Sequence, residues 1–175
     1  MKLKGLLHVT FAYVVTLGVA WATLQALGEN PIWDMFWADI AATIAIFVFS
    51  RLYKNSSFYD AYWSVVPIVI ACWWLSFAEP DANTTRQILV GLLVLAWGVR
   101  LTWNWARGWD GLHHEDWRYV RIRERTGVLY WPTSFAGIHL MPTLWVFLGC
   151  LPLFPALSAG TSPAPPSPPS ASTRR

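Results

Sequence analysis

The sequence predicts an all-α, polytopic transmembrane helical protein with about five spans, followed by a disordered Pro/Ser-rich tail. Of its 175 residues, 55% are hydrophobic and only 13% are charged, whereas a soluble domain of this size carries about 25% charged residues. The apolar residues come in long blocks, and a helix needs about 20 such residues to cross the hydrocarbon core of a bilayer. The composition and the long apolar blocks together exclude an ordinary soluble domain.

Each of five apolar blocks is expected to form one spanning helix. The start of the chain, MKLKGLLHVTFAYVVTLGVAWATLQALG, resembles a signal peptide. Its apolar part exceeds the roughly 7–15 residues of a signal sequence and further spans follow, so we expect an uncleaved helix. The third block is short for a span. The fifth contains His139, Pro142 and Pro152, which predict a kink or a break. The blocks are residues 5–27, 32–49, 62–78, 88–105 and 135–157.

The segment after Leu157 has a different composition, SAGTSPAPPSPPSASTRR. Its prolines and small polar residues bury too little apolar surface to fold, which predicts disorder. We therefore expect a transmembrane domain over residues 1–157 and a tail over residues 158–175. Cys72 and Cys150 lie inside apolar blocks, which favours buried thiols over a disulfide.

The basic residues predict an N-terminus in the cytoplasm. With five crossings, ten Lys and Arg side chains then lie inside and three outside, as the positive-inside rule requires. We expect the membrane to be that of the endoplasmic reticulum or the bacterial inner membrane. The inside set is Lys2, Lys4, Arg51, Lys54, Arg100, Arg107, Arg118, Arg121, Arg123 and Arg125, and the outside set is Arg86, Arg174 and Arg175.

The polar residues concentrate in one stretch, WGVRLTWNWARGWDGLHHEDWRYVRIRER, at residues 97–125. Arg100, Asn104 and Arg107 stand at i, i+4 and i+7 and share one helix face, where they could grip phosphate; equally, the arginines could only snorkel to the interface. Four consecutive residues, HHED, cannot converge on one ion, so no metal site is predicted. The basic and aromatic residues after them favour anionic lipid head groups over nucleic acid as partners.

Two further polar positions lie at or inside the spans. Asp39 is more than one turn inside the second block and needs a polar partner. His139 is one candidate, although a histidine on an apolar face is more often satisfied by a backbone carbonyl. Tyr59, Asp60 and Tyr62 stand at the cytoplasmic edge of the third block, where a tyrosine could donate a proton or hold a carbonyl. The alternative is an interfacial tyrosine beside a helix-start aspartate.

Three segments, NSSFYDAYWSVVP, WGVRLTWNWARGWDGLHHEDWRY and FAGIHLMPTLWVFLGCLPLFPAL, resemble the steroid 5-alpha-reductase C-terminal-domain superfamily, in its small uncharacterised membrane-protein branch. The resemblance covers most of the chain up to about Leu157. It implies an NADPH-dependent oxidoreductase that reduces an activated carbon–carbon double bond, typically an enone in a sterol-like lipid. It assigns Asp39 and Tyr62 to catalysis at the substrate carbonyl, and to cofactor binding it assigns Arg100, Asn104, Arg107, Glu115, Asp116, Arg118 and Tyr119.

The chain departs from that superfamily after the LPLFP segment, where the relatives continue into further spans with a late Arg-His-Pro-Asn-Tyr-type motif around the cofactor. This departure predicts a truncated chain, with cofactor binding and activity weak or absent unless the fold is completed. The alternative is a non-enzymatic membrane scaffold, or a truncated partner of an intact relative.

Overall fold

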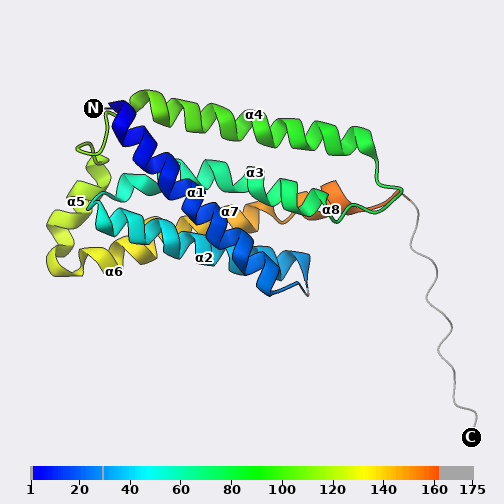
Figure 1. The fold of residues 1–175 in the computed structure, drawn as a ribbon, viewed down its shortest axis with the longest axis horizontal. Helices are drawn as coiled ribbons and strands as arrows, with labels where there is room; N and C mark the ends of the chain where they lie inside the picture. Colours follow the sequence, from blue (N-terminus) through cyan, green and yellow to red (C-terminus); the bar gives the residue numbers. More distant parts are fainter. Residues whose placement is uncertain (1, 29, 162–175) are drawn as a thin grey trace, which may run out of the picture.

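A computed structural model describes residues 2–28 and 30–161, and within them the regular secondary structure is helical apart from one β-bridge between Ala82 and Gly160. The all-α prediction is therefore confirmed. In this part of the chain, five helical segments are long and apolar enough to cross a membrane, as predicted, which indicates a multi-span integral membrane protein (Figure 1). They are α1 (Lys2–Ala26), α2 (Pro31–Leu52), Ser56–Leu75, α4 (Thr84–Gly108) and Trp117–Cys150.

The turn between α1 and α2 is fixed by local capping. The Asn30 side chain accepts hydrogen bonds from the backbone N–H groups of Ile32 and Trp33, at 3.0 and 3.1 Å. Pro31 occupies the first helical position, where its missing N–H costs nothing. Asp34 returns a bond by accepting from the Asn30 N–H at 3.1 Å, a reciprocal arrangement that satisfies otherwise orphaned donors. The chain therefore reverses tightly and α2 runs back along α1.

The third span combines two elements. A short 3-10 helix, η1 (Ser56–Tyr59), precedes α3 (Tyr62–Leu75). The helix ends three residues before the predicted boundary at 78, yet η1 extends the span to 20 residues at its other end. That length reaches across the hydrocarbon core.

The fifth helical segment differs in extent from the predicted block. The helix begins at Trp117 rather than 135 and ends at Cys150 rather than 157, so its first part is the charged α5. A π-helical segment lies just before Pro142, whose missing N–H removes one helical bond, and the helix stops before Pro152. The elements are α5 (Trp117–Thr126), η2 (Gly127–Leu129), α6 (Tyr130–Ser134), η3 (Phe135–Leu140), α7 (Met141–Cys150) and α8 (Leu153–Ser158).

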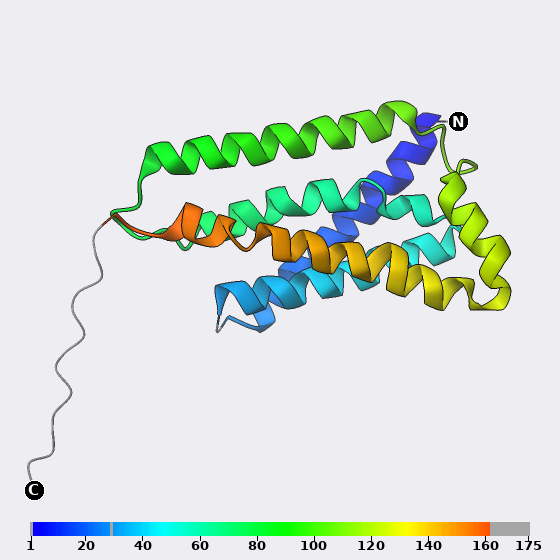
Figure 2. The ribbon, with the colours of Figure 1, turned by 180° about the vertical axis from the view of Figure 1, so that it is seen from behind.

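The helices run nearly side by side, with α1 crossing obliquely over α2 and α3 (Figure 1). Viewed from behind, α4 lies along one side and is separate from α7 over most of its length (Figure 2). One end of the bundle, which we call the polar end, holds residues 2–4, 51–61 and 108–126. The helix termini there carry most of the chain's charged side chains.

The opposite end is closed by contacts between the α3–α4 loop and the segment after α7. Glu79 N–H donates to the Ser158 carbonyl at 2.9 Å, and the Gln87 side chain donates to the Leu157 carbonyl at 2.8 Å. Residues 158–161, which we expected to begin the tail, thus contact this loop. The rest of that expected tail, residues 162–175, lies outside the described residues.

Packing between α3 and α4 predicts opposite effects for two glycine substitutions on α4. A Cβ at Gly98 would lie 2.5 Å from the Ser64 carbonyl oxygen, whereas a Cβ at Gly91 would meet nothing within 4 Å. We expect Gly98→Ala to lower the free energy of unfolding by about 1–3 kcal/mol through overpacking. Gly91→Ala should be neutral or slightly stabilising. Thermal unfolding in detergent measures both, and equal melting temperatures would contradict this packing.

Candidate functional site

A buried carboxylate and a buried phenol form the centre of the candidate site. Asp39 lies on α2 and Tyr62 begins α3, and each is 4% exposed. The Tyr62 hydroxyl donates to Asp39 Oδ1 at 2.8 Å. The polar partner that Asp39 needs inside a span is therefore Tyr62, and these two residues, predicted separately from the sequence, lie together.

Of the two interpretations of His139, the partnership with Asp39 does not hold. His139 Nδ1 lies 3.0 Å from the Ser134 carbonyl oxygen, and its Nε2 lies 3.0 Å from Ser50 Oγ. Both ring nitrogens are thus satisfied locally, one of them by a backbone carbonyl, as the alternative interpretation expected. The π-helical segment that contains His139 thus places the ring beside Ser50, near the end of α2, rather than beside Asp39.

Hydroxyl groups extend the pair into a buried chain of hydrogen bonds. Thr43 Oγ1 donates to the Tyr62 hydroxyl at 3.5 Å and lies 2.8 Å from Thr143 Oγ1. The Tyr59 hydroxyl lies 2.8 Å from the same Thr143 oxygen, and the rings of Tyr59 and Tyr62 have centroids 5.1 Å apart. Sequence reasoning missed Thr43 and Thr143, because a single threonine in an apolar helix usually bonds its own backbone and signals nothing.

A small cavity of about 30 Å³ adjoins Asp39 and Tyr62, between α1, α2 and α3. Its other polar wall residues are Tyr13 and Thr16, both on α1. The remainder of the wall is aliphatic or methionine. The arrangement combines a carboxylate, hydroxyl groups and an apolar surround, which suits a neutral polar group attached to an apolar molecule.

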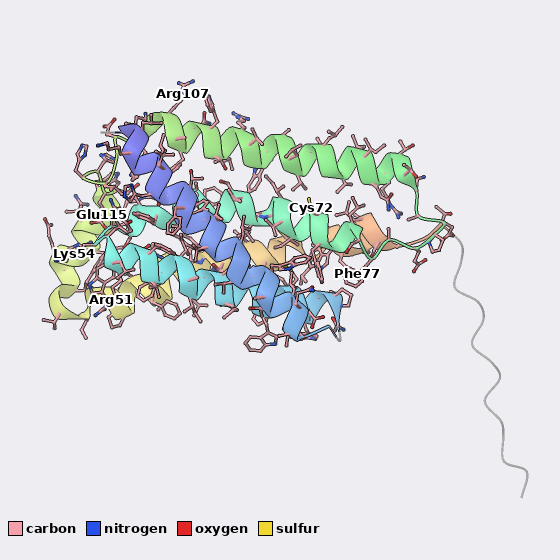
Figure 3. All side chains as sticks on the ribbon, viewed as in Figure 1. Arg51, Lys54, Cys72, Phe77, Arg107 and Glu115 are labelled. Carbon is pink, nitrogen blue, oxygen red and sulfur yellow. The ribbon has the colours of Figure 1, made fainter. Side chains whose placement is uncertain are left out.

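At the polar end, Glu115 joins three elements. Its carboxylate accepts from the Ser56 N–H at 2.8 Å, from the Arg123 guanidinium at 2.8 and 2.9 Å, and from the Tyr130 hydroxyl at 3.2 Å. Glu115 thereby ties η1 to α5 and α6. It lies near Lys54 and Arg51 at this end of the bundle (Figure 3). All of these bonds are internal, so the geometry of Glu115 is that of a structural clamp.

The next acidic residue lies in a cleft. Asp116, Arg118 and Tyr119 line a cleft of about 540 Å³, together with Asp60 and Trp105. Arg118 binds the Asp116 carboxylate through two bonds of 2.8 Å, and the Tyr119 hydroxyl donates to Asp60 Oδ1 at 2.5 Å. The Arg118 guanidinium holds the pKa of Asp116 below its ordinary value. Three predicted site residues are therefore brought together here.

Of the three residues of α4 predicted to bind the cofactor, only Asn104 lines a cleft at the polar end. Asn104 lines a second cleft of about 200 Å³, which shares Asp60, Trp105 and Asp116 with the first. Arg100 and Arg107 are exposed and line neither cleft. Figure 3 shows Arg107 directed away from the other helices. The larger cleft faces the side of α4 that carries Leu101 and Trp105, about 100–140° around the helix from Arg100.

The fold and these contacts define a multi-span helical membrane protein with a polar pair inside the bundle and a polar cleft at one end. Comparison with family models identifies the chain more narrowly: residues 46–167 match DUF1295, a family described as protein of unknown function, and the chain belongs to it. The matched residues include Tyr62 and the polar stretch at 97–125, whereas Asp39 precedes them. No curated protein matches the chain, and no solved structure does.

The contact between Asp116 and Arg118 predicts a local effect on α5. Asp116 caps this helix by accepting from the Arg118 N–H at 2.8 Å. Removal of such a cap costs about 1 kcal/mol, which raises local opening about fivefold. We expect Asp116→Ala to increase tryptic cleavage after Arg118 and Arg121, and Asp116→Asn, which keeps a capping oxygen, to increase it less.

The same contact carries a pH dependence. Because the folded-state pKa of Asp116 is lowered, its stabilisation of α5 is present at neutral pH and is lost as the pH falls through that lowered pKa. Cleavage that is identical in wild type, Asp116→Ala and Asp116→Asn would show that the cap does not stabilise α5.

Proposed function

We propose that this protein is a membrane-embedded reductase of lipid enones, in which the Asp39–Tyr62 pair polarises the carbonyl of the substrate. The observation that carries the proposal is the 2.8 Å hydrogen bond between the Tyr62 hydroxyl and the Asp39 carboxylate, beside a cavity inside the bundle. Ionisable groups inside a membrane are costly and usually functional. The resemblance to the steroid-reductase superfamily names the reaction class.

The pair is suited to hold an oxygen rather than to attack a carbon. Tyr62 directs its proton at Asp39, and Thr43 donates to the Tyr62 oxygen, so the phenol is fixed from both sides. With Tyr62 bonded to Oδ1, Oδ2 is the oxygen of the pair that remains free. A protonated Asp39 carboxyl would donate from Oδ2 to a carbonyl oxygen and stabilise the charge that develops there. This chain thereby supplies binding, orientation and polarisation of the enone.

The clefts at the polar end are the proposed place for the nicotinamide cofactor. The donors there are the Asn104 amide, the Arg118 guanidinium and the Trp105 indole N–H, which has no acceptor among residues 2–28 and 30–161. Asp60 and Asp116 add acceptors suited to ribose hydroxyls. These groups fit the riboside and amide parts of NADPH better than its phosphates, since Arg118 already binds Asp116.

When bound, NADPH supplies a hydride to the carbon β to the carbonyl and is oxidised to NADP⁺, while a proton from solvent completes the α carbon. Tyr59 links the two regions of the chain, because it lines the larger cleft and its ring contacts that of Tyr62. Arg100 and Arg107 line neither cleft. A role for them in phosphate binding therefore requires the cofactor to extend over the outer side of α4.

We also propose that the polar end faces the cytoplasm. Lys2, Arg51, Lys54 and the arginines of α5 lie at this end, and positive charge favours the cytoplasmic side. A cytoplasmic location also places the clefts where a nicotinamide cofactor is available.

Enone reduction by the full chain in liposomes tests the proposed reaction. We expect cholest-4-en-3-one and NADPH to give the saturated ketone at a low rate, detected by mass spectrometry, in line with the weak activity predicted from the sequence. Tyr62→Phe and Asp39→Asn should each lower the rate by about 10²-fold or more, because polarisation of the carbonyl is lost. Tyr53→Phe is the matched control, since Tyr53 is a partly buried tyrosine that stacks on Phe58 and lines neither the cavity nor the larger cleft. Absence of product with wild type would reject the function, and full activity of both site variants would reject the site.

Labelling of single cysteines tests the orientation. Asp110 at the polar end and Pro80 at the opposite end are both exposed. In a Cys72→Ser background, a membrane-impermeant maleimide added to intact cells should label Pro80→Cys and leave Asp110→Cys unlabelled until the cells are permeabilised. The reverse pattern would invert the topology.

A further inference from the structure

Two residues that line the cavity beside the Asp39–Tyr62 pair each hold a buried polar atom without a hydrogen-bond partner in the described part of the chain. The atoms are Asp39 Oδ2 and Thr16 Oγ1. Asp39 is 4% exposed and Thr16 is 1% exposed. Buried polar atoms in native proteins are nearly always hydrogen-bonded. These two atoms, on the neighbouring helices α2 and α1, therefore indicate a polar group that residues 2–28 and 30–161 do not provide.

The other polar groups of the cavity wall are already engaged. The Tyr13 hydroxyl donates to the Phe58 carbonyl at 2.9 Å, and the Tyr62 hydroxyl donates to Asp39 Oδ1 at 2.8 Å. The rest of the wall is apolar, with residues such as Ala20, Val66 and Ile70. Free hydrogen-bonding capacity in this cavity is thus concentrated on Thr16 and on one oxygen of Asp39.

We propose that Thr16 is a substrate-binding residue, and that the oxygen of a neutral lipid lies between Thr16 Oγ1 and Asp39 Oδ2. The inference rests on the proposed function and adds a contact from α1, a helix to which neither the sequence pattern nor the resemblance assigned a role. The cavity of about 30 Å³ holds only the oxygen-bearing end of the lipid. The body of the lipid extends past Leu17 and Val69, which line the cavity and are partly exposed.

The chemistry of the two groups selects the ligand. A threonine hydroxyl has one proton to donate, so Thr16 can donate to a ligand oxygen. Asp39 Oδ2 accepts from a ligand hydroxyl, or donates to a ligand carbonyl when the carboxyl is protonated. A carboxylate or phosphate head group would instead face the Asp39 carboxyl with too few donors. The site therefore suits a ketone or an alcohol on an apolar body.

Binding of three sterol-like probes to the full chain in detergent tests this site. The probes are radiolabelled cholest-4-en-3-one, cholesterol and 5α-cholestane, which carry a ketone, a hydroxyl and no oxygen. We expect Thr16→Val to weaken binding of the ketone or of the alcohol about fivefold, the effect of one lost hydrogen bond, and to leave cholestane binding unchanged. Thr16→Ser should bind as wild type does. Thr10→Val, an exposed threonine on the same helix, should also have no effect.

Three results would overturn the proposal. The first is equal binding of the oxygen-bearing probes by wild type and Thr16→Val, which would mean that Thr16 holds only water; the cavity exceeds the roughly 10–15 Å³ that a water needs. The second is equal weakening of cholestane binding, which would indicate a packing effect. The third is no binding of the ketone or the alcohol by wild type. Thr16-dependent binding without reduction of the enone would reject the proposed reaction and leave this binding site standing.

Discussion

The bundle depends on how it accommodates a carboxyl group inside a membrane. Asp39 is the ninth residue of the 22-residue helix α2, and insertion of an aspartate near the middle of a spanning helix costs about 2.5–3.5 kcal/mol. The hydrogen bond from Tyr62 offsets part of that cost, since bonds to charged groups contribute about 1.5–3 kcal/mol. The bond fixes where the start of α3 lies along α2. Thr43, Thr143 and Tyr59 then continue the same set of hydrogen bonds towards α7.

A second set of bonds determines how the polar end assembles. Glu115 connects η1, α5 and α6, while Asn55 donates to the carbonyls of Leu112 and His114, each at 2.9 Å. The loop after α4 is thereby held against the loop after α2. As a consequence, Asp60 and Asp116, which are far apart in the sequence, line the same clefts. Specific side-chain hydrogen bonds therefore hold the loops of the polar end against one another.

The sequence predicts the number of spanning helices well. A bilayer requires each spanning helix to be both long and apolar, so the length and hydropathy of the blocks locate five spans. The fifth helical segment starts earlier than predicted because charged α5 continues through η2 and α6 into the apolar helix, and α5 carries no hydropathy signal. In the candidate site, too, one feature follows from the sequence and another depends on tertiary packing. Depth alone marks Asp39 as unusual, but its choice of Tyr62 over His139 depends on how α2, α3 and η3 pack, which no local pattern encodes.

Arg100, Asn104 and Arg107 illustrate why spacing alone is insufficient at α4. Their i, i+4, i+7 pattern correctly places them near one another on the helix, yet the pattern does not say which way that face points. In the described residues of α4, only Gly98 is buried, and it packs against Ser64 and Ile68. This contact orients Leu101 and Trp105 towards the cleft and leaves Arg100 and Arg107 exposed. Close packing at Gly98 therefore determines which polar residues of α4 can contact a ligand in the clefts.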